Sequence, residues 1–218
     1  IRDKFEIDEG DPFNELLNAR STNNVRATNL FSSVTSEVID GSENGMKIVN
    51  VTVEEKPTGE ITIGAGAGTE GGTLGFSVSE NNFLGKGVKL STALRLTEDT
   101  VKGSFSVVNP NFNYSGKALS TSFERTSIDK ITDNGYEVDK TGFSFGTGYE
   151  QFENLRFTPK ISNYYEDLKT SSKASSSLKK QAGSYIESKF FYTLDYDLRN
   201  QRYQPTEGFR SIFRQGVP

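Results

Sequence analysis

The sequence predicts a small α+β module over residues 1–56, followed over residues 57–218 by antiparallel strands of a transmembrane β-barrel. Three observations predict this division. Helical spacing of apolar residues is confined to the first part, and alternation of apolar and polar residues fills the second. Aromatic residues reach 11%, although hydrophobic residues make up only 33%. Because aromatic residues are depleted in disordered chains, we expect a folded chain without one large apolar core.

The first part has the pattern of two helices followed by two strands. The chain begins inside a first helix, which residues 8–11 end, and Pro12 lies in the first turn of a second helix over residues 12–28. One apolar face of this second helix is expected to contain Leu16, Leu17, Val25 and Leu30. Two strands and the turn between them are expected at residues 33–38, 47–54 and 40–45. This order is that of the end of an α+β domain.

The second part alternates with period two, as strands do when their two faces meet different surroundings. Residues rich in Gly, Asn and Asp separate the alternating runs. About nine strands are expected, at residues 60–69, 73–80, 88–97, 101–108, 116–126, 140–150, 155–165, 185–195 and 208–217.

A soluble β-sandwich would show the same alternation, so the polar face and the connections decide between the two folds. The polar positions hold Gly, Ser, Lys, Arg and Glu, as expected for a wet lumen, and the apolar face is rich in aromatic residues. Short connections at 71–72 and 98–100 alternate with long polar ones at 127–139 and 166–181. This alternation favours an outer-membrane barrel. The serine-rich stretch 170–177 is expected to be a mobile loop tip.

Composition excludes several kinds of chemistry. The chain has no Cys and no His, and therefore no disulfide, thiol nucleophile, histidine base or imidazole ligand. Its net charge of −4 without a basic run indicates no nucleic-acid partner. Glu54 and Glu55 are adjacent on a strand and point to opposite faces, so they are no acid/base pair. We expect no enzymatic activity, no catalytic residue, no metal site and no cofactor.

Asp195 and Asp197 share one face of a strand and offer oxygen atoms to a cation. Arg199 and Arg202 follow closely in the sequence, which favours a salt-bridge network in the lumen over a metal site. The aspartates at positions 129, 133 and 139 do not have the spacing of a calcium loop.

Several segments resemble the BamA family, in which POTRA domains precede an outer-membrane β-barrel. Residues 24–34 resemble the helix-to-strand signature of a POTRA domain, and residues 51–59 followed by 64–68 are similar to the hinge into the first barrel strand. The remaining matches are the Asn-x-Leu-Gly-x-Gly turn at 80–87, the Asn-Pro-x-Phe turn at 109–112 and the Asp, Pro-Thr and Gly motif at 197–208. The matches occur in order along almost the whole chain.

The resemblance implies most of a last POTRA domain at residues 1–56, in the periplasm, and the first half of a barrel at 57–218, in the outer membrane of a Gram-negative bacterium. About nine of roughly sixteen strands are then present, so the barrel is incomplete and the chain is a fragment. The implied function is insertion of β-barrel proteins without covalent chemistry. The implied partners are nascent outer-membrane β-barrel proteins, accessory lipoproteins of the assembly complex and the lipid bilayer.

The resemblance also implies where substrates and partners bind. A lateral gate, at which the first barrel strand offers its edge to a substrate strand, is expected at Glu60, Ile61, Thr62, Ile63, Gly64, Ala65, Gly66, Ala67 and Gly68. The glycines have a second interpretation, which is relief of crowding at a curved barrel seam. The edge strand of the POTRA domain is expected at Ser33, Val34, Thr35, Ser36, Glu37 and Val38, and contact with a partner lipoprotein at Arg2 and Glu9.

Two alternative functions remain open. A POTRA-barrel transporter, either a two-partner secretion pore or a TamA-like translocation factor, has the same plan. A soluble β-sandwich binding module requires that the aromatic faces pack on one another instead of on lipid.

Overall fold

The structure is a computed structural model that describes residues 1–43, 45–68, 71–201 and 203–218. Arg202, expected in a lumen salt-bridge network, and Thr69, the expected end of the first barrel strand, lie outside these ranges. The chain divides into two compact units, and each is described by itself. The first comprises Ile1–Thr58 and Tyr196–Ser211, and the second Gly59–Asp195 and Ile212–Pro218. No helix within the described residues is long and apolar enough to cross a membrane.

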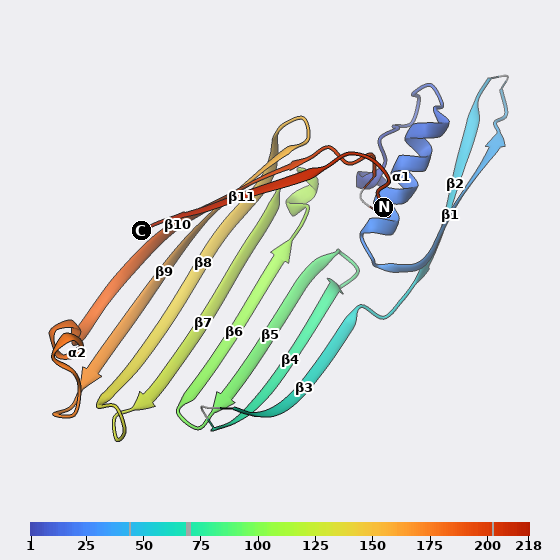
Figure 1. The fold of residues 1–218 in the computed structure, drawn as a ribbon. Helices are drawn as coiled ribbons and strands as arrows, with labels where there is room; N and C mark the ends of the chain where they lie inside the picture. The colour runs from blue at the N-terminus through green and yellow to red at the C-terminus, as the bar shows by residue number, and fades with distance from the viewer. Residues whose placement is uncertain (44, 69–70, 202) are drawn as a thin grey trace. The chain divides into compact units, whose positions relative to one another are not determined.

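The first unit contains one helix beside a two-stranded antiparallel sheet (Figure 1). Its elements are the 3₁₀ helix η1 (Arg2–Lys4), the helix α1 (Glu15–Ala27) and the strands β1 (Phe31–Asp40) and β2 (Lys47–Glu55). The side chain of Asn14 caps α1 by accepting a hydrogen bond from the Leu17 N–H at 3.1 Å. The expected first helix is wrong in extent, because only three residues adopt 3₁₀ geometry.

The buried face of α1 contains Val25, as expected, but otherwise differs from the expected one. Asn18, Ser21, Thr22 and Val25 are buried, whereas Leu16 is exposed. The hydroxyls of Ser21 and Thr22 donate to the carbonyl oxygens of residues 17 and 18 at 2.8 and 2.9 Å, so these polar groups are satisfied inside the unit. Periodicity of apolar residues alone does not detect such a face.

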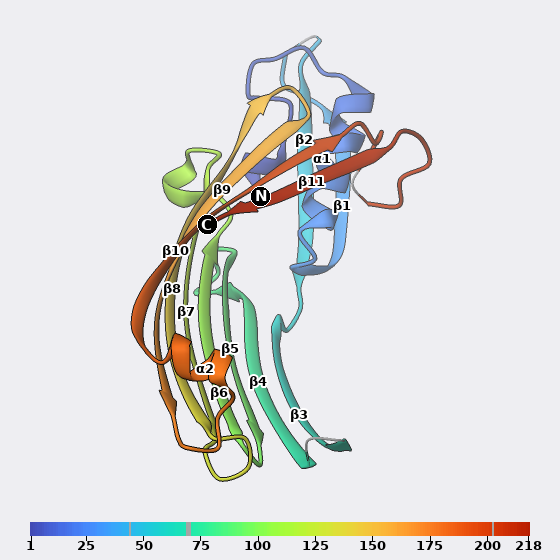
Figure 2. The same ribbon diagram turned by 60° about the vertical axis from the view of Figure 1, so that its left-hand side comes forward.

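The second part forms a nine-stranded sheet in which every strand pairs with its sequence neighbour, from β3 at one edge to β11 at the other. The pairs whose register is known, from β3 to β9, are antiparallel. The predicted number of strands is confirmed, and Figure 2 shows the strands bending together. The strands are β3 (Gly59–Gly68), β4 (Gly71–Phe83), β5 (Val88–Thr97), β6 (Thr100–Asn109), β7 (Ala118–Lys130), β8 (Tyr136–Phe152), β9 (Leu155–Thr170), β10 (Gly183–Asp197) and β11 (Arg210–Val217).

Contrary to expectation from the sequence, short and long connections do not lie at opposite ends of the sheet. In an antiparallel meander successive connections lie at opposite ends, so the connections β3–β4, β5–β6, β7–β8 and β9–β10 share one end. The two short connections at 71–72 and 98–100 and the two long ones at 127–139 and 166–181 all belong to this set. The supposed long loop at 127–139 is mostly strand, because β7 continues to Lys130 and β8 begins at Tyr136.

The serine-rich segment 170–177 makes specific contacts with the β7–β8 connection. Ala174 is buried, and a side chain placed on Gly135 would lie 2.3 Å from the Ala174 nitrogen, so the two backbones touch. Ser171 donates its N–H to the Gly135 carbonyl at 2.8 Å. The short helix α2 (Ser176–Gln181) follows, with the Ser175 hydroxyl accepting from the Leu178 N–H at its start. The small side chains of this segment allow the close approach at Ala174.

Candidate functional site

The large sheet has an apolar face that is exposed and a polar face that is buried at Ser144 and Ser162, on β8 and β9. Residues opposite one another in the register lie on the same face, and successive residues along a strand lie on opposite faces. Ser144 and Ser162 are opposite partners on the polar face and are only 5% and 1% exposed. Phe143, beside Ser144 in the chain and on the other face, is 52% exposed. A water-soluble sheet has the reverse arrangement.

The apolar face is continuous across strands. Phe105 on β6 is opposite Phe123 on β7, which is opposite Phe143 on β8. All three rings are exposed within the described residues, so no second sheet covers them. This overturns the β-sandwich alternative, in which such rings would pack on one another. Further exposed apolar side chains on this face are Ile61, Ile63, Leu74, Phe76, Leu94, Val101, Phe145, Ile161, Ile186 and Phe190.

Aromatic rings also form a connected row over β8 to β11. Tyr149 contacts Phe157 edge to face, with 5.8 Å between ring centroids, and Phe157 lies 6.2 Å from Tyr192. Tyr192 in turn lies 6.1 Å from Phe213, and its hydroxyl pairs with Gln215. Rings with an apolar body and a polar tip suit the boundary between lipid and water. The sequence indicated aromatic enrichment but not that these rings are neighbours.

The expected gate segment forms β3, at one edge of the sheet. All ten residues of β3 are exposed, with Ile61 at 69% and Ile63 at 78%. Gly64, Gly66 and Gly68 alternate with these apolar residues and therefore lie on the polar face. A side chain added at any of the three would meet nothing within 4 Å among the described residues.

Glycines elsewhere in the sheet are needed to avoid clashes. A side chain on Gly142 would lie 2.6 Å from the Tyr164 ring, and one on Gly146 would lie 2.9 Å from the Ser120 hydroxyl. Crowding therefore explains the glycines of β8, but within the described residues it does not explain those of β3.

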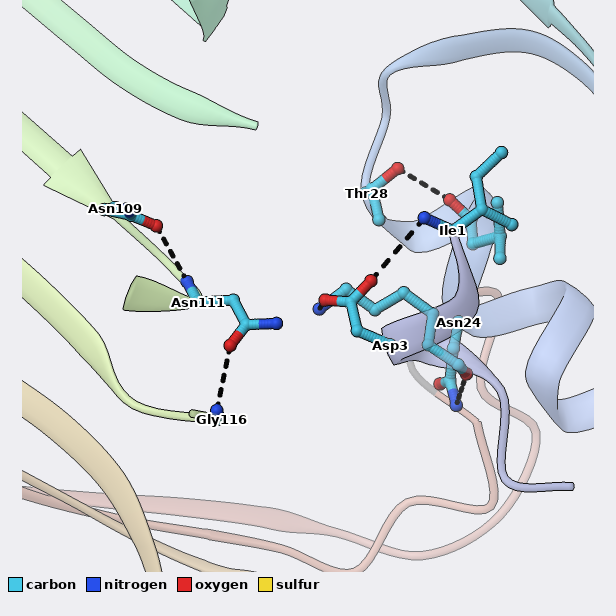
Figure 3. A network of polar contacts seen from close by, with 9 residues as sticks. Ile1, Asp3, Asn24, Thr28, Asn109, Asn111 and Gly116 are labelled. Atoms are coloured by element: carbon cyan, nitrogen blue, oxygen red, sulfur yellow. Dashed lines mark hydrogen bonds and ion pairs between the residues drawn. The ribbon is translucent and has the colours of Figure 1, made fainter. Parts of the chain in front are cut away.

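Two turns at one end of the sheet are closed in the same way by asparagine. The Asn82 side-chain oxygen accepts from the Gly87 N–H at 2.8 Å, and the Asn111 oxygen accepts from the Gly116 N–H at 2.8 Å (Figure 3). Asn109 also accepts from the Asn111 N–H at 3.1 Å. These turns correspond to the two expected at 80–87 and 109–112. The sequence located them, and the structure identifies the Asn-to-Gly bond that closes each.

The motif at 197–208 connects β10 to β11. Asn200 accepts from the N–H groups of Thr206 and Glu207 at 3.2 and 3.3 Å and so closes the connection. Gly208 has a φ of +89°, and a side chain on it would lie 2.1 Å from the Leu198 carbonyl oxygen. Only glycine fits this position. Asp197 forms a bidentate pair with Arg199 at 2.7 Å, which is one pair of the expected salt-bridge network.

The helix–strand module offers a hollow and a strand edge. A hollow of about 440 Å³ lies between α1 and β1, lined among others by Phe13, Asn18, Ser36 and Val38. The expected edge residues 33–38 lie in β1, which pairs with β2 on one side. Arg2 and Glu9 form an exposed ion pair with each other, and the N-terminal ammonium of Ile1 lies 3.5 Å from Asp3 (Figure 3).

One carboxyl of this module has a shifted pKa. Lys47 donates a hydrogen bond to Asp40 across the β1–β2 pair, and its charge adds to the effect, so the pKa of the Asp40 carboxyl is lowered. Within the described residues, no three acidic side chains gather as they would to hold a metal ion. The arrangement supports binding through strands and surfaces.

Comparison with known proteins agrees with this geometry. The model of the Omp85 superfamily domain matches residues 82–217, which include β5 to β11. The chain belongs to the Omp85 superfamily. Omp85 proteins are outer-membrane β-barrels that assemble or transport other proteins, which accounts for a sheet with its apolar face exposed.

Solved structures show the same fold. BamA from Haemophilus ducreyi lacking POTRA domains 1–3 is similar with a TM-score of 0.72 and 18% identity, over 99% of this chain and 44% of that one. CdiB from Escherichia coli is similar with a TM-score of 0.55 and 13% identity, over 100% of this chain and 42% of that one. CdiB from Acinetobacter baumannii is similar with a TM-score of 0.54 and 9% identity, over 98% of this chain and 42% of that one. The chain thus spans less than half the length of each of these structures and forms part of an Omp85 barrel.

Proposed function

We propose that this chain belongs to a protein that inserts β-barrel proteins into the bacterial outer membrane, with β3 as the strand on which substrate strands are templated. A strand entering lipid carries unpaired N–H and C=O groups, each of which costs several kcal/mol if it stays unsatisfied. A strand edge that offers its own main-chain groups removes that cost by β-augmentation. No covalent step is needed.

The exposed, glycine-rich β3 is the observation that carries this proposal. It pairs with β4 in full register from Gly59 to Gly68, which holds the strand extended. Its polar face bears little more than backbone at Gly64, Gly66 and Gly68, where no side chain would meet a neighbour within 4 Å. Glycines weaken a strand and allow another backbone to approach closely. Both properties suit an edge that must pair and release.

The module at residues 1–56 is proposed to be a partial POTRA domain in the periplasm. The single helix packed beside β1 and β2 supports this, as does the hollow beside the β1 edge. An extended peptide pairing along residues 33–38 would place its side chains in that hollow. Arg2 and Glu9 remain the proposed contact with a partner lipoprotein, and their exposure makes them accessible.

Disulfide trapping in cells tests the gate. Single cysteines placed from Ile61 to Gly68 in the full-length protein are combined with a cysteine in the terminal strand of a nascent outer-membrane protein. We expect cross-links that accumulate in register during assembly. A cysteine at Phe143, exposed on the same sheet but in the inner strand β8, is the matched control and should not trap the substrate. Trapping of β3 only to the parent's own last strand would disprove the gate.

The second candidate function is a secretion pore, which the likeness to two CdiB structures supports. In that case β3 remains paired within its own barrel, and the lumen conducts an exported partner. Cells depleted of the protein would then lose one secreted product while other outer-membrane proteins still fold. Loss of many outer-membrane barrels on depletion would instead support insertion.

A further inference from the structure

Two cations face each other on the polar face of the sheet. Arg95 on β5 is the register partner of Lys102 on β6, and side chains of directly opposite residues are neighbours on one face. Like charges in this position destabilise a sheet. Both residues are exposed, and neither forms an ion pair with a residue of the described ranges. The pair therefore needs a compensating negative charge.

Two other cations of the same face have such compensation. Lys140 lies 3.0 Å from Glu166 and 3.6 Å from Glu187, and Lys189 lies 2.9 Å from Glu187. Lys140 also lies over the Tyr164 ring, 4.7 Å from its centroid. The face thus matches its cations with carboxylates around β8 to β10. Lys89 and Lys160 on this face also form no ion pair with a described residue, but they lie opposite Val108 and Gly146, whereas Arg95 and Lys102 lie opposite each other.

A hollow next to this pair has room for side chains from elsewhere. It measures about 440 Å³ and is lined by Lys102, Glu124, Lys140, Tyr164 and Lys189, with further residues of the same strands. A carboxylate fits beside Arg95 and Lys102, because a guanidinium donates two parallel hydrogen bonds to it and an ammonium adds a third. An extended acidic segment would satisfy both cations and occupy the hollow.

We propose that a carboxylate-bearing segment of the same protein, outside residues 1–218, docks on Arg95 and Lys102. The polar face of a barrel wall points into the lumen, where the rest of the same barrel is the nearest source of side chains. The chain spans only 44% of the similar BamA structure, so most of such a barrel lies outside it. The inference is independent of whether the protein inserts or exports, because both candidates place this face in the lumen.

Photo-crosslinking of the full-length protein in native outer membranes tests the contact. Benzoylphenylalanine replaces Arg95, Lys102 or, as a control, Lys89, which lies on the same face but opposite Val108. We expect the first two positions to cross-link to a segment of the same polypeptide that contains Asp or Glu, in higher yield than position 89. Cross-links to another polypeptide, to a segment without acidic residues, or no more than at position 89 would overturn the proposal.

Removing the charge of Arg95 or Lys102 provides a second test, because the unfolding temperature should change in opposite directions with and without a docked acidic segment. If no acidic segment is present, Arg95→Gln relieves repulsion from Lys102 and raises the temperature at which the folded barrel unfolds in detergent. If the acidic segment is docked, the same substitution removes its partner and lowers that temperature. We expect the decrease for Arg95→Gln and for Lys102→Gln, and no decrease for Lys89→Gln. An increase, or no change, would refute the docked segment.

Discussion

Ser144 on β8 donates a hydrogen bond of 2.8 Å to Ser162 on β9, and both side chains are buried on the polar face of the sheet. The ring of Phe143, on the other face, is exposed. This inversion of the usual arrangement means that the bilayer is the solvent for the apolar face, since water would not stabilise a row of exposed rings.

A charge at position 143 should interfere with membrane insertion. Phe143→Arg places a cation on the lipid-facing side, which costs up to about 2–4 kcal/mol near the bilayer midplane. The folded fraction of the full-length protein in lipid vesicles, measured over a urea series, should fall accordingly. Phe143→Leu is the control and should fold nearly as the parent does. Equal folding of the arginine variant would show that this face does not meet lipid.

Overpacking should destabilise the sheet at Ser162. This side chain is 1% exposed, so Ser162→Leu forces larger atoms into filled space at a cost of about 1–3 kcal/mol. Ser162→Ala loses only the bond with Ser144, worth about 1 kcal/mol. Urea unfolding of both variants from vesicles should rank them in that order. The reverse order would mean that the polar face is open at this point.

The asparagine turns should depend on their acceptor oxygen. Asn82→Ala removes the acceptor for the Gly87 N–H and should lower the free energy of unfolding by about 1 kcal/mol. Asn82→Asp retains an oxygen at the same place and should recover most of that loss. Vesicle unfolding curves distinguish the two variants. If alanine and aspartate behave alike, this bond does not stabilise the turn.

Two glycines should respond in opposite ways to alanine. Gly208→Ala should prevent folding of the β10–β11 connection, because φ is +89° and the added carbon would lie 2.1 Å from the Leu198 oxygen. Gly64→Ala meets nothing within 4 Å and should leave unfolding unchanged. If β3 is the templating edge, Gly64→Ala should still reduce the yield of substrate cross-links, because a less flexible strand pairs and releases less readily. If Gly64→Ala unfolds like the parent and also gives the parent's yield of substrate cross-links, the flexibility of Gly64 has no part in templating.

The Asp40–Lys47 pair should make the module slightly less stable in acid. Because the folded pKa of Asp40 is lowered, the pair contributes stability above the unfolded pKa, and this contribution is lost as pH falls through the folded pKa. Carbon-13 NMR of the Asp40 carboxyl should show its titration at higher pH in Lys47→Gln than in the parent. Lys47→Arg keeps the cation and should stay close to the parent. An unchanged titration in Lys47→Gln would exclude the interaction.

Local signals in the sequence predicted the strands well, because each strand meets two different environments and alternates accordingly. Nine strands and the turns at 80–87 and 109–112 could be located in this way. The ends of β7, β8 and β9 could not be located from the sequence. Cross-strand pairing extends those strands beyond the alternating core, to Lys130, from Tyr136 and to Thr170. The helix face formed by Asn18, Ser21 and Thr22 was hidden for a similar reason, since its polar groups are satisfied by bonds that composition does not show.

The sequence by itself determined the order of elements, the period-two alternation and the absence of His and Cys chemistry, because these depend on residue types and local spacing. Only the tertiary structure decided which residues become neighbours. It separated glycines that relieve crowding on β8 from those on β3 that meet no neighbour among the described residues, and it placed Arg95 opposite Lys102. Register is the physical reason, since a shift of one residue between strands moves every side chain to the other face.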